Sequence, residues 1–463
     1  MRQLMKIKTL KLLSFIYVLL TMTQHVVHGE IQSTIPIIQL QYEALSRDTF
    51  SDARFALIED GDTLNLPAQI RHRGASSAYY QKKSFAIKLL DNNEQKLDTS
   101  LLGMRSDNYW ILDAMAVDKA RMRNRVAMDL WLEFSTKPYY VDLEPKMCNG
   151  YNGKFVEVYV NGDYNGLYCL MERVDRKQLK LKKLKGNTLN GVLYKSVNWE
   201  GSFFKAITPY NNGSATWMRY EYQYPDIEDN LINWKPLYDA MLYVDTASAE
   251  EFAEGASMKY DIPVFMDYYL FTCLLSARDS RGKNLFLSYY NVNQNSKLLI
   301  TPWDLDHSFG RMYNSGEESA TTAFTWKDQP YLRFKSEIPQ YDSLLIQRYA
   351  YLRENAFSYT SLSQRFDAYF DLFEQTGADA REMERWSGVD GITLNFAEEK
   401  AYIDTWLDQR LAYTDSLFAY HSAESSFENT FSEQYSSRKV IHDGQIFILR
   451  GDKTYTLQGQ EVK

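Results

Sequence analysis

The chain has 463 residues, of which 45% are hydrophobic and 24% are charged, and its formal net charge is -8. This composition supplies enough apolar side chains for a globular core, most simply arranged as two lobes, and excludes a disordered chain. The acidic balance argues against nucleic acid as a partner, because that class of protein needs a basic surface.

The N-terminus has the layout of a secretory signal peptide over residues 1–29. Basic residues precede an apolar stretch at 12–22, and a small-residue exit follows at 27–29. The apolar stretch is short for a membrane span, and no later run of about 18 apolar residues exists. We therefore expect a secreted or cell-surface protein whose mature chain has no membrane span.

Three cysteines, Cys148, Cys169 and Cys273, are scattered through predicted core elements. An odd, scattered set argues against a disulfide framework and offers too few ligands for a zinc site. We expect buried thiols that behave as small hydrophobic side chains.

Residues from about 36 to 175 are predicted to be β-rich, with one long helix. Apolar side chains alternate on both sides of a polar, glycine-containing turn in 68–91, which predicts strand, loop and strand. The segment 118–134 has apolar residues one turn apart and Asp118 as its predicted N-cap, which indicates a helix. In 154–175 the pair Asn161-Gly162 predicts a tight turn between two strands.

Residues from about 176 to 420 are predicted to be mostly helical. The apolar segment 261–280 indicates a buried helix that runs into a charged loop, and 285–306 indicates a hairpin. Amphipathic helices are expected over 340–420, with breaks near "QTGADA" and "SGVDGI". The order of elements therefore predicts a β-rich half followed by a helical half.

The hairpin predicted at 285–306 joins two polar clusters, which must therefore lie close in space. "ARDSRGKN" carries Asp279 and Asn284, and "DLDHSFG" begins with Asp304. The order Asp-x4-Asn, hairpin, then Asp close to Phe-Gly is typical of protein kinases, in which the first Asp accepts a hydroxyl proton and the others hold Mg²⁺. A structural alternative is that Asp279 caps a loop while Asp304 and Asp306 bind calcium or backbone amides.

Five motifs occur in order along the chain, "RGASSAYYQKKSFAIKL", "DKARMRN", "YNGLYCLMERVD", "SARDSRGKN" and "PWDLDHSFG". Their order and spacing resemble those of the CotH (spore coat protein H) kinase family, atypical secretory-pathway protein kinases, over about 36–420. The resemblance implies an α+β, two-lobed, atypical protein-kinase-like fold, with a β-rich N-lobe at about 36–175 and a mostly helical C-lobe at about 176–420. It also implies ATP and Mg²⁺, or Mn²⁺, as cofactors and an exported or surface protein as substrate.

The same resemblance assigns roles by position. It implies that Asp279 is the catalytic residue, that Asp304 binds the metal ion and that Asn284 is a second ligand. Asp306 occupies a further acidic position of the Pro-Trp-Asp-x-[Asp/Glu] signature, where it is either another metal ligand or a brace for the loop.

Phosphates need cations and backbone amides nearby, and the first motif offers both. The turn after Arg73, with Ser76 and Ser77, is the expected phosphate-covering loop. Lys83, in the family's Lys-Lys-Ser motif, and Lys88, in "FAIK", are both candidates to pair with phosphate, and the sequence leaves the choice open. A solvated strand edge is the alternative for either lysine.

Arg123 and Asn124 are expected to face the nucleotide cleft, because Met122 and Val126 take the packing face of their helix. An ordinary charged helix face is the competing interpretation.

Met171, Glu172 and Arg173 follow the second strand of the predicted hairpin, where the chain leaves the first lobe. Their backbone is the expected hinge contact for adenine. Glu172 could instead cap a following helix.

Other functions remain open on this sequence. A glycosyltransferase would use Asp304-x-Asp306 to bind Mn²⁺ and a nucleotide sugar, but it requires a parallel βαβ domain where a hairpin is predicted. A pseudokinase or surface adhesin would keep the fold without the chemistry. The histidine spacing of zinc hydrolases is missing, and His307 is expected to support the acidic pair or to be exposed.

The end of the chain differs in composition from the rest. A Ser/Glu-rich linker is predicted at 422–438, and 439–463 is a β-like module too small to bury a core alone. The module resembles the C-terminal sorting tails of type IX secretion, which implies export to the cell surface. A simple β-appendage is the alternative.

Overall fold

The structure is a computed structural model that describes residues 34–198, 204, 206–226, 231–323 and 330–421, together with four strands between 437 and 462. The predicted signal peptide lies outside the described residues, as does the predicted linker apart from its last two residues. The described chain has a β-rich N-terminal part and a largely helical C-terminal part, so the predicted α+β class is confirmed.

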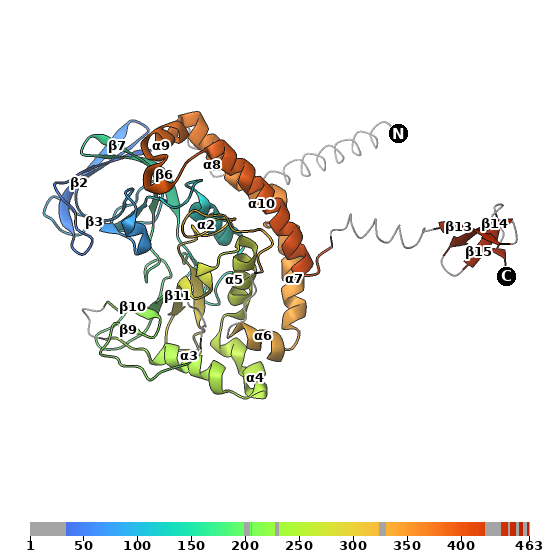
Figure 1. The fold of residues 1–463 in the computed structure, drawn as a ribbon. Helices are drawn as coiled ribbons and strands as arrows, with labels where there is room; N and C mark the ends of the chain where they lie inside the picture. Colours follow the sequence, from blue (N-terminus) through green and yellow to red (C-terminus); the bar gives the residue numbers. More distant parts are fainter. Residues whose placement is uncertain are drawn as a thin grey trace, which may run out of the picture.

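Seven strands of the N-terminal part form a closed barrel in the order β1-β2-β3-β4-β5-β7-β6 (Figure 1). The strands are β1 (Ile37–Gln41), β2 (Ser51–Glu59), β3 (Asp62–Arg73), β4 (Ser84–Leu89), β5 (Tyr109–Asp113), β6 (Gly153–Val160) and β7 (Asp163–Met171). The parallel pairing of β1 with β6 closes the barrel and sets Ile37 opposite Glu157. Closure was not predicted, because this pairing joins residues far apart in the sequence.

The barrel interior is apolar because alternate side chains of each strand point inward. In β4, Phe85, Ile87 and Leu89 belong to this core. Ser84 and Lys88 therefore lie on the outer face of the strand. The predicted alternation is confirmed, and it leaves polar side chains on the outside of the barrel.

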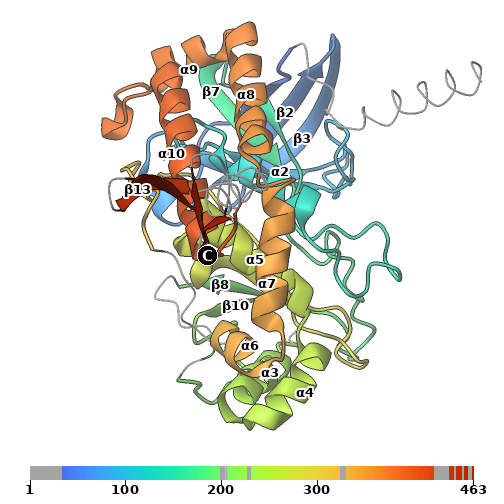
Figure 2. The same ribbon diagram turned by 90° about the vertical axis from the view of Figure 1, so that its right-hand side faces the viewer.

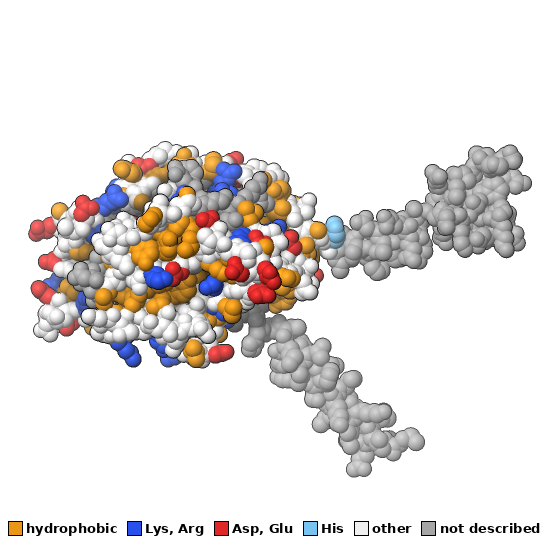
Figure 3. Space-filling model, turned by 90° about the horizontal axis from the view of Figure 1, so that it is seen from below, with side chains coloured by type: hydrophobic (Ala, Val, Ile, Leu, Met, Phe, Trp, Pro, Cys, Tyr) orange, Lys and Arg blue, Asp and Glu red, His pale blue; other side chains and the backbone are white. Residues whose placement is uncertain are grey.

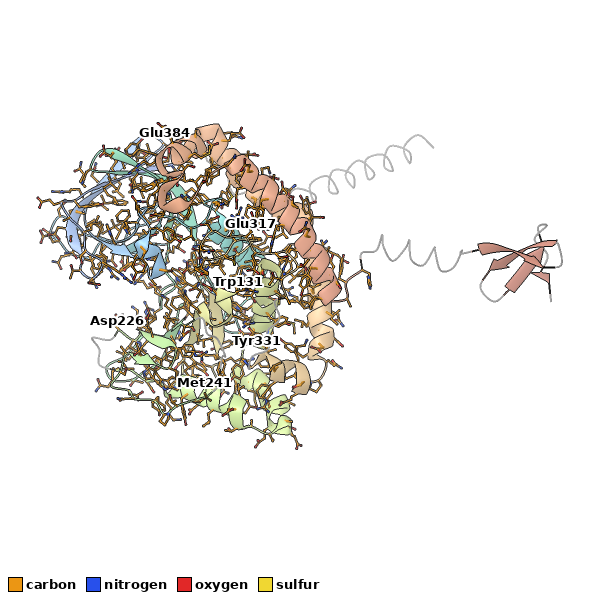
Figure 4. The ribbon with its side chains drawn as sticks, in the orientation of Figure 1. Trp131, Asp226, Met241, Glu317, Tyr331 and Glu384 are labelled. Atoms are coloured by element: carbon orange, nitrogen blue, oxygen red, sulfur yellow. The ribbon has the colours of Figure 1, made fainter. Side chains whose placement is uncertain are left out.

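Helix α2 (Arg123–Phe134) connects β5 to β6 and lies at the centre of the molecule, where Figure 4 labels Trp131. The Trp131 ring packs against Tyr268 and Phe271, with ring centroids 6.0 and 5.3 Å away. Both rings belong to α5 (Ile262–Leu275). Helix α2 therefore joins the barrel to the C-terminal part through a buried aromatic contact.

The predicted helix starts later than expected, at Arg123 rather than just after Asp118. Asp118 still serves the helix start, because its Oδ2 accepts hydrogen bonds from the backbone amides of Met122 and Arg123 at 2.8 and 2.7 Å. These are amides that have no partner within the helix. The carboxylate caps the helix from outside rather than as the N-cap residue.

A second sheet has five antiparallel strands in the order β12-β11-β8-β10-β9. They are β8 (Val192–Val197), β9 (Thr216–Trp217), β10 (Tyr220–Tyr224), β11 (Lys283–Tyr289) and β12 (Leu299–Pro302). Strands β11 and β12 are the predicted hairpin. Strands β6 and β7 are the other predicted hairpin, and Asn161 and Gly162 form its turn with φ of 53° and 94°.

Seven further helices complete the described C-terminal part. Their bounds are α3 (Lys235–Thr246), α4 (Ala249–Lys259), α6 (Tyr331–Glu337), α7 (Tyr341–Arg353), α8 (Tyr359–Thr376), α9 (Ala378–Trp386) and α10 (Phe396–Leu417). The two predicted breaks are confirmed, since Gly377 in the left-handed conformation ends α8 and a short 3-10 turn at Val389–Gly391 precedes α10. Helices α7, α8 and α10 run along one side of the molecule (Figure 2), and α9 packs on β7. The C-terminal helices thus return to the barrel.

Acidic and basic side chains are interspersed on the face of the molecule seen in Figure 3. Within the described ranges, every helix is too short or too polar to span a bilayer.

A separate four-stranded antiparallel sheet forms near the C-terminus. Its strands are β13 (Ser437–His442), β14 (Gln445–Arg450), β15 (Lys453–Thr456) and β16 (Glu461–Val462). The strands match the predicted β-like module, and its role as a sorting tail stays a prediction.

Candidate active site

The β11–β12 hairpin brings the two predicted polar clusters together. The Asn284 amide nitrogen donates to the carbonyl of Asp304 at 3.1 Å. The His307 Nδ1 lies 2.9 Å from Asp279 Oδ2, and its Nε2 lies 3.6 Å from Asp306 Oδ1. One imidazole therefore lies between the predicted catalytic acid and the acidic pair.

Asp279 begins the 3-10 turn η3 (Asp279–Arg281), just after the end of α5. Burial would raise its pKa, but the hydrogen bond and charge of His307, with Lys283 at 3.6 Å, outweigh burial and lower it. Asp279 is therefore ionised at neutral pH, as a proton acceptor must be. The contacts of Asp279 with His307 and Lys283 are both made by Oδ2.

His307 contacts acids on both sides and is mostly buried. Burial alone would lower its pKa, whereas Asp306 and Asp279 raise it to about 9. The side chain supports the acidic pair, which is one of the two alternatives from the sequence.

Acidic groups crowd the end of β12. Burial raises the pKa of Asp306 to about 7, and the charges of Asp304 and Asp113 act in the same direction. Burial also raises the pKa of Asp113, at the end of β5, and Asp304 again adds to the effect while Arg73 opposes it. His307 opposes the shift of Asp306, so the remaining repulsion is among Asp113, Asp304 and Asp306, and a bound cation would relieve it.

The donor atoms at this point fit a hard divalent cation. Carboxylate oxygens of Asp304 and Asp306 and the amide oxygen of Asn284 are the ligand types that Mg²⁺ prefers. Among the described residues, no three His, Cys, Asp or Glu side chains form a metal cage. A Mg²⁺ ion bound together with nucleotide phosphates needs only one or two carboxylates, because phosphate and water supply the other ligands.

The loop that carries the acids is held in place by α2. The backbone amide of Leu305 donates to Asn124 Oδ1 at 3.0 Å, and the Asn124 amide nitrogen donates to Asp113 Oδ2 at 3.2 Å. The hydroxyl of Tyr151 also donates to Asn124 Oδ1, at 2.6 Å. Asn124 is thus placed between Asp113 and the loop that carries Asp304 and Asp306, and its hydrogen bonds orient that loop.

Arg123 is not placed as expected, because its side chain is 0% exposed and cannot face a cleft. Its guanidinium pairs with Asp118 at 2.6 Å and with Glu399 of α10 at 2.7 Å. It also donates to the carbonyl of Phe309 at 3.3 Å. The Arg123 guanidinium therefore connects the start of α2 to α10 and, through the Phe309 carbonyl, holds the end of the acidic loop.

The loop between β3 and β4 approaches the acids from the barrel. The Arg73 guanidinium lies 5.9 Å from the Trp303 ring and close to Asp113. Ser76 and Ser77 lie in a 3-10 turn, η1 (Ser76–Tyr79), with Ser76 exposed. Burial raises the pKa of Tyr80, and Asp306 raises it further, so the end of this loop is near the acidic pair.

The lysines of this loop and of β4 have different surroundings. Lys83 donates to the carbonyl of Ala78 within its own loop at 2.7 Å. Lys88 lies 4.1 Å from the centre of the Phe50 ring, at the opposite end of β4 from Ser84. Lys82, which was not chosen from the sequence, is 2% exposed and is paired with Glu382 of α9 at 2.6 Å.

The predicted hinge is held mainly by Glu172. Its carboxylate accepts hydrogen bonds from the backbone amides of Arg105 and Asn152, both at 2.9 Å, and from the Gln178 side chain at 2.8 Å. These bonds join neighbouring loops and do not cap a helix. Met171 ends β7, opposite Ile111 of β5. The Arg173 guanidinium lies 4.0 Å from the Tyr109 ring.

Sequence reasoning missed three charged residues that the structure brings to the site, Asp113, Lys195 and Lys283. Asp113 ends the apolar strand β5 and Asp304 lies two residues after β12, so an acid at the end of an apolar run is a signal that could have found Asp113. Lys195 lies within β8 and carries no motif.

An ionised acid beside further carboxylate and amide groups, with an arginine approaching from a second element, is an arrangement that phosphotransferases use. The model of the family described as CotH kinase protein matches residues 70–414, which is three quarters of the chain. The chain therefore belongs to the CotH kinase family, and this membership indicates a kinase-type phosphotransferase. No curated protein matched the chain.

Proposed function

We propose that the protein is an ATP-dependent protein kinase that transfers the γ-phosphoryl group of ATP to Ser or Thr hydroxyls of exported or surface proteins. The observation that carries the proposal is that one hairpin brings its two polar clusters together. Asn284 of β11 bonds the Asp304 carbonyl that follows β12, and His307 lies between Asp279 and Asp306. Family membership supports the same reaction class. The barrel and the C-terminal part would then be the two lobes of an atypical kinase.

Each group has a role in this proposal. Asp279 orients the acceptor hydroxyl and takes its proton. Asp304 and Asn284, with Asp306, hold Mg²⁺ or Mn²⁺, which would neutralise charge on the transferring phosphoryl group. Arg73 and the loop after it contact the phosphates. Catalysis rests on positioning and charge stabilisation rather than on covalent chemistry.

The predicted signal peptide and sorting tail motivate the proposal that the kinase acts on the export route or at the cell surface. A glycosyltransferase is less well supported, because the acidic loop follows an antiparallel hairpin and not a parallel strand. A pseudokinase or adhesin keeps the fold without transfer, and it is separated from the kinase by experiment.

The test compares wild type with Asp304→Ala. Wild type is expected to transfer labelled phosphate from ATP to a Ser/Thr-containing protein with Mg²⁺ or Mn²⁺ present, and to gain thermal stability with nucleotide and metal together. Asp304→Ala should lose both effects. Asp62→Ala, an exposed acid at the start of β3, is the matched control and should keep them. Nucleotide-dependent stabilisation without transfer would indicate a pseudokinase, and absence of both in wild type would contradict the proposal.

A further inference from the structure

Lys195 is a half-buried lysine in the middle of β8. It pairs in register with Phe286 of β11 on one side and with Glu221 of β10 on the other. Directly paired residues of antiparallel strands point to the same face of a sheet. Phe286 contacts the Trp303 ring, with centroids 5.7 Å apart. Lys195 therefore lies on the face of the second sheet that carries the acidic loop.

The neighbours of Lys195 come from both parts of the molecule. Its charged neighbours are Arg73 from the barrel, Lys283, Glu221 and Asp304. Burial, Arg73 and Lys283 lower the pKa of Lys195, and together they outweigh Glu221 and Asp304, which raise it. Three cations thus converge beside the proposed metal ligands, although like charges repel.

Among the described residues, no hydrogen bond or ion pair holds the Lys195 ammonium group. Lys82, by comparison, is paired with Glu382 at 2.6 Å. A half-buried ammonium group without an internal partner, beside Arg73 and Asp304, is placed to meet an anion that is absent from the protein itself. A phosphate chain bridging metal and cations would satisfy all of these groups together.

We propose that Lys195 is a further nucleotide-binding residue, which donates to the phosphate oxygens of ATP from the second sheet while Arg73 does so from the barrel. The inference rests on the proposed function and deepens it, because it assigns a phosphate contact outside the β3–β4 loop. Lys195 would then favour ligands with phosphates over adenosine alone.

The experiment measures the dissociation constants of ATP, ADP and adenosine by calorimetry with Mg²⁺ present, for the full-length protein. Lys195→Met keeps the length and apolar character of the side chain and removes its charge. We expect it to weaken ATP binding about tenfold to a hundredfold while adenosine binding stays within about twofold. Lys195→Arg should restore most of the ATP affinity. Lys154→Met, an exposed lysine of β6, should bind ATP as wild type does.

Several results would overturn the proposal. Unchanged ATP affinity in Lys195→Met would contradict it and leave the proposed function standing, and so would an effect confined to the KM of the protein acceptor. An equal loss of ATP and adenosine binding, together with a lower melting temperature, would show a structural role instead. If wild type itself binds no nucleotide, the proposed function fails, and this inference fails with it.

Discussion

Two clusters of buried charge in this molecule are built differently. In the cluster of Glu382, Lys82 and Arg121, which we call the closed cluster, the charged groups are paired with one another inside the protein. Glu382 Oε1 accepts from Lys82 at 2.6 Å and from Arg121 at 2.7 Å, and Oε2 accepts from the Leu167 amide at 2.7 Å. In the cluster around Asp304, which we call the open cluster, pairing is incomplete. His307 contacts Asp279 and Asp306, but Asp304 raises the pKa of Asp113 and of Asp306, and among the described residues no hydrogen bond or ion pair holds Lys195.

The difference separates a structural use of charge from a functional one. A buried charge with every hydrogen bond made inside the chain holds elements together, here the β3–β4 loop, β7 and α9. A cluster whose charged groups are not all paired within the protein can be completed by a ligand. The family match covers both clusters, so it is this difference in pairing that favours the open cluster as the site.

The largest effect is expected at the open cluster, on the reaction rate. Asp279→Asn keeps the shape of the side chain but removes the proton acceptor. We expect kcat to fall by about 10²- to 10⁴-fold, with ATP affinity and melting temperature close to wild type. Phosphotransfer assays and calorimetry measure both quantities. A variant that keeps more than a tenth of wild-type kcat would exclude Asp279 as the base.

The next largest effect is expected at the closed cluster, on stability. Glu382→Gln leaves Lys82 and Arg121 buried without a counter-charge, and the free energy of unfolding should fall by about 3–5 kcal/mol. Glu384→Gln, an exposed residue of α9 labelled in Figure 4, is the matched control and should change it by less than about 0.5 kcal/mol. Urea unfolding measures both, and equal effects of the two variants would refute the distinction between them.

A smaller change in the free energy of unfolding is expected when pH is lowered. Burial would raise the pKa of Glu382, but Lys82 and Arg121 outweigh it and hold the pKa below its ordinary value of 4.5. The contribution of this carboxylate is therefore complete above pH 4.5 and is lost as pH falls through its folded-state pKa. The stability gap between wild type and Glu382→Gln should narrow on acidification from about pH 6 to about pH 3. A gap that stays constant would show that Glu382 does not titrate with folding.

The smallest effect is expected for Lys83→Met, which loses one hydrogen bond to Ala78 within an accessible loop. The free energy of unfolding should fall by about 0.5–1.5 kcal/mol in urea titrations. A loss as large as that of Glu382→Gln would mean that Lys83, like Lys82, is part of the closed cluster.

Local patterns were enough to predict much of the site. The hairpin at β11–β12 is a short-range element, so its ends necessarily bring Asp279 near Asp304, and the breaks around α9 follow from glycine. Strands β3, β4, β6 and β7 of the barrel were also predictable, because their apolar patterns and turn residues lie within a few residues of each other.

Contacts between distant segments could not be predicted in this way. The alternation in β1 does not say that it pairs with β6, and nothing in "DKARMRN" indicates that Arg123 meets Glu399 on a helix much later in the chain. Lys195 carries no motif because its importance comes from register with β10 and β11. Helical periodicity gives only the angle between side chains around the helix axis. Tertiary packing decides which of those side chains are buried and which residues they meet.

The pairing of Lys82 with Glu382 also bears on the order in which the chain is made. Lys82 and Arg121 leave the ribosome well before α9, about 300 residues later for Lys82. Until α9 has been synthesised, these two cations have no counter-charge for their buried positions, so the barrel cannot complete its native packing early. A nascent chain would remain incompletely folded until almost the whole family region had emerged.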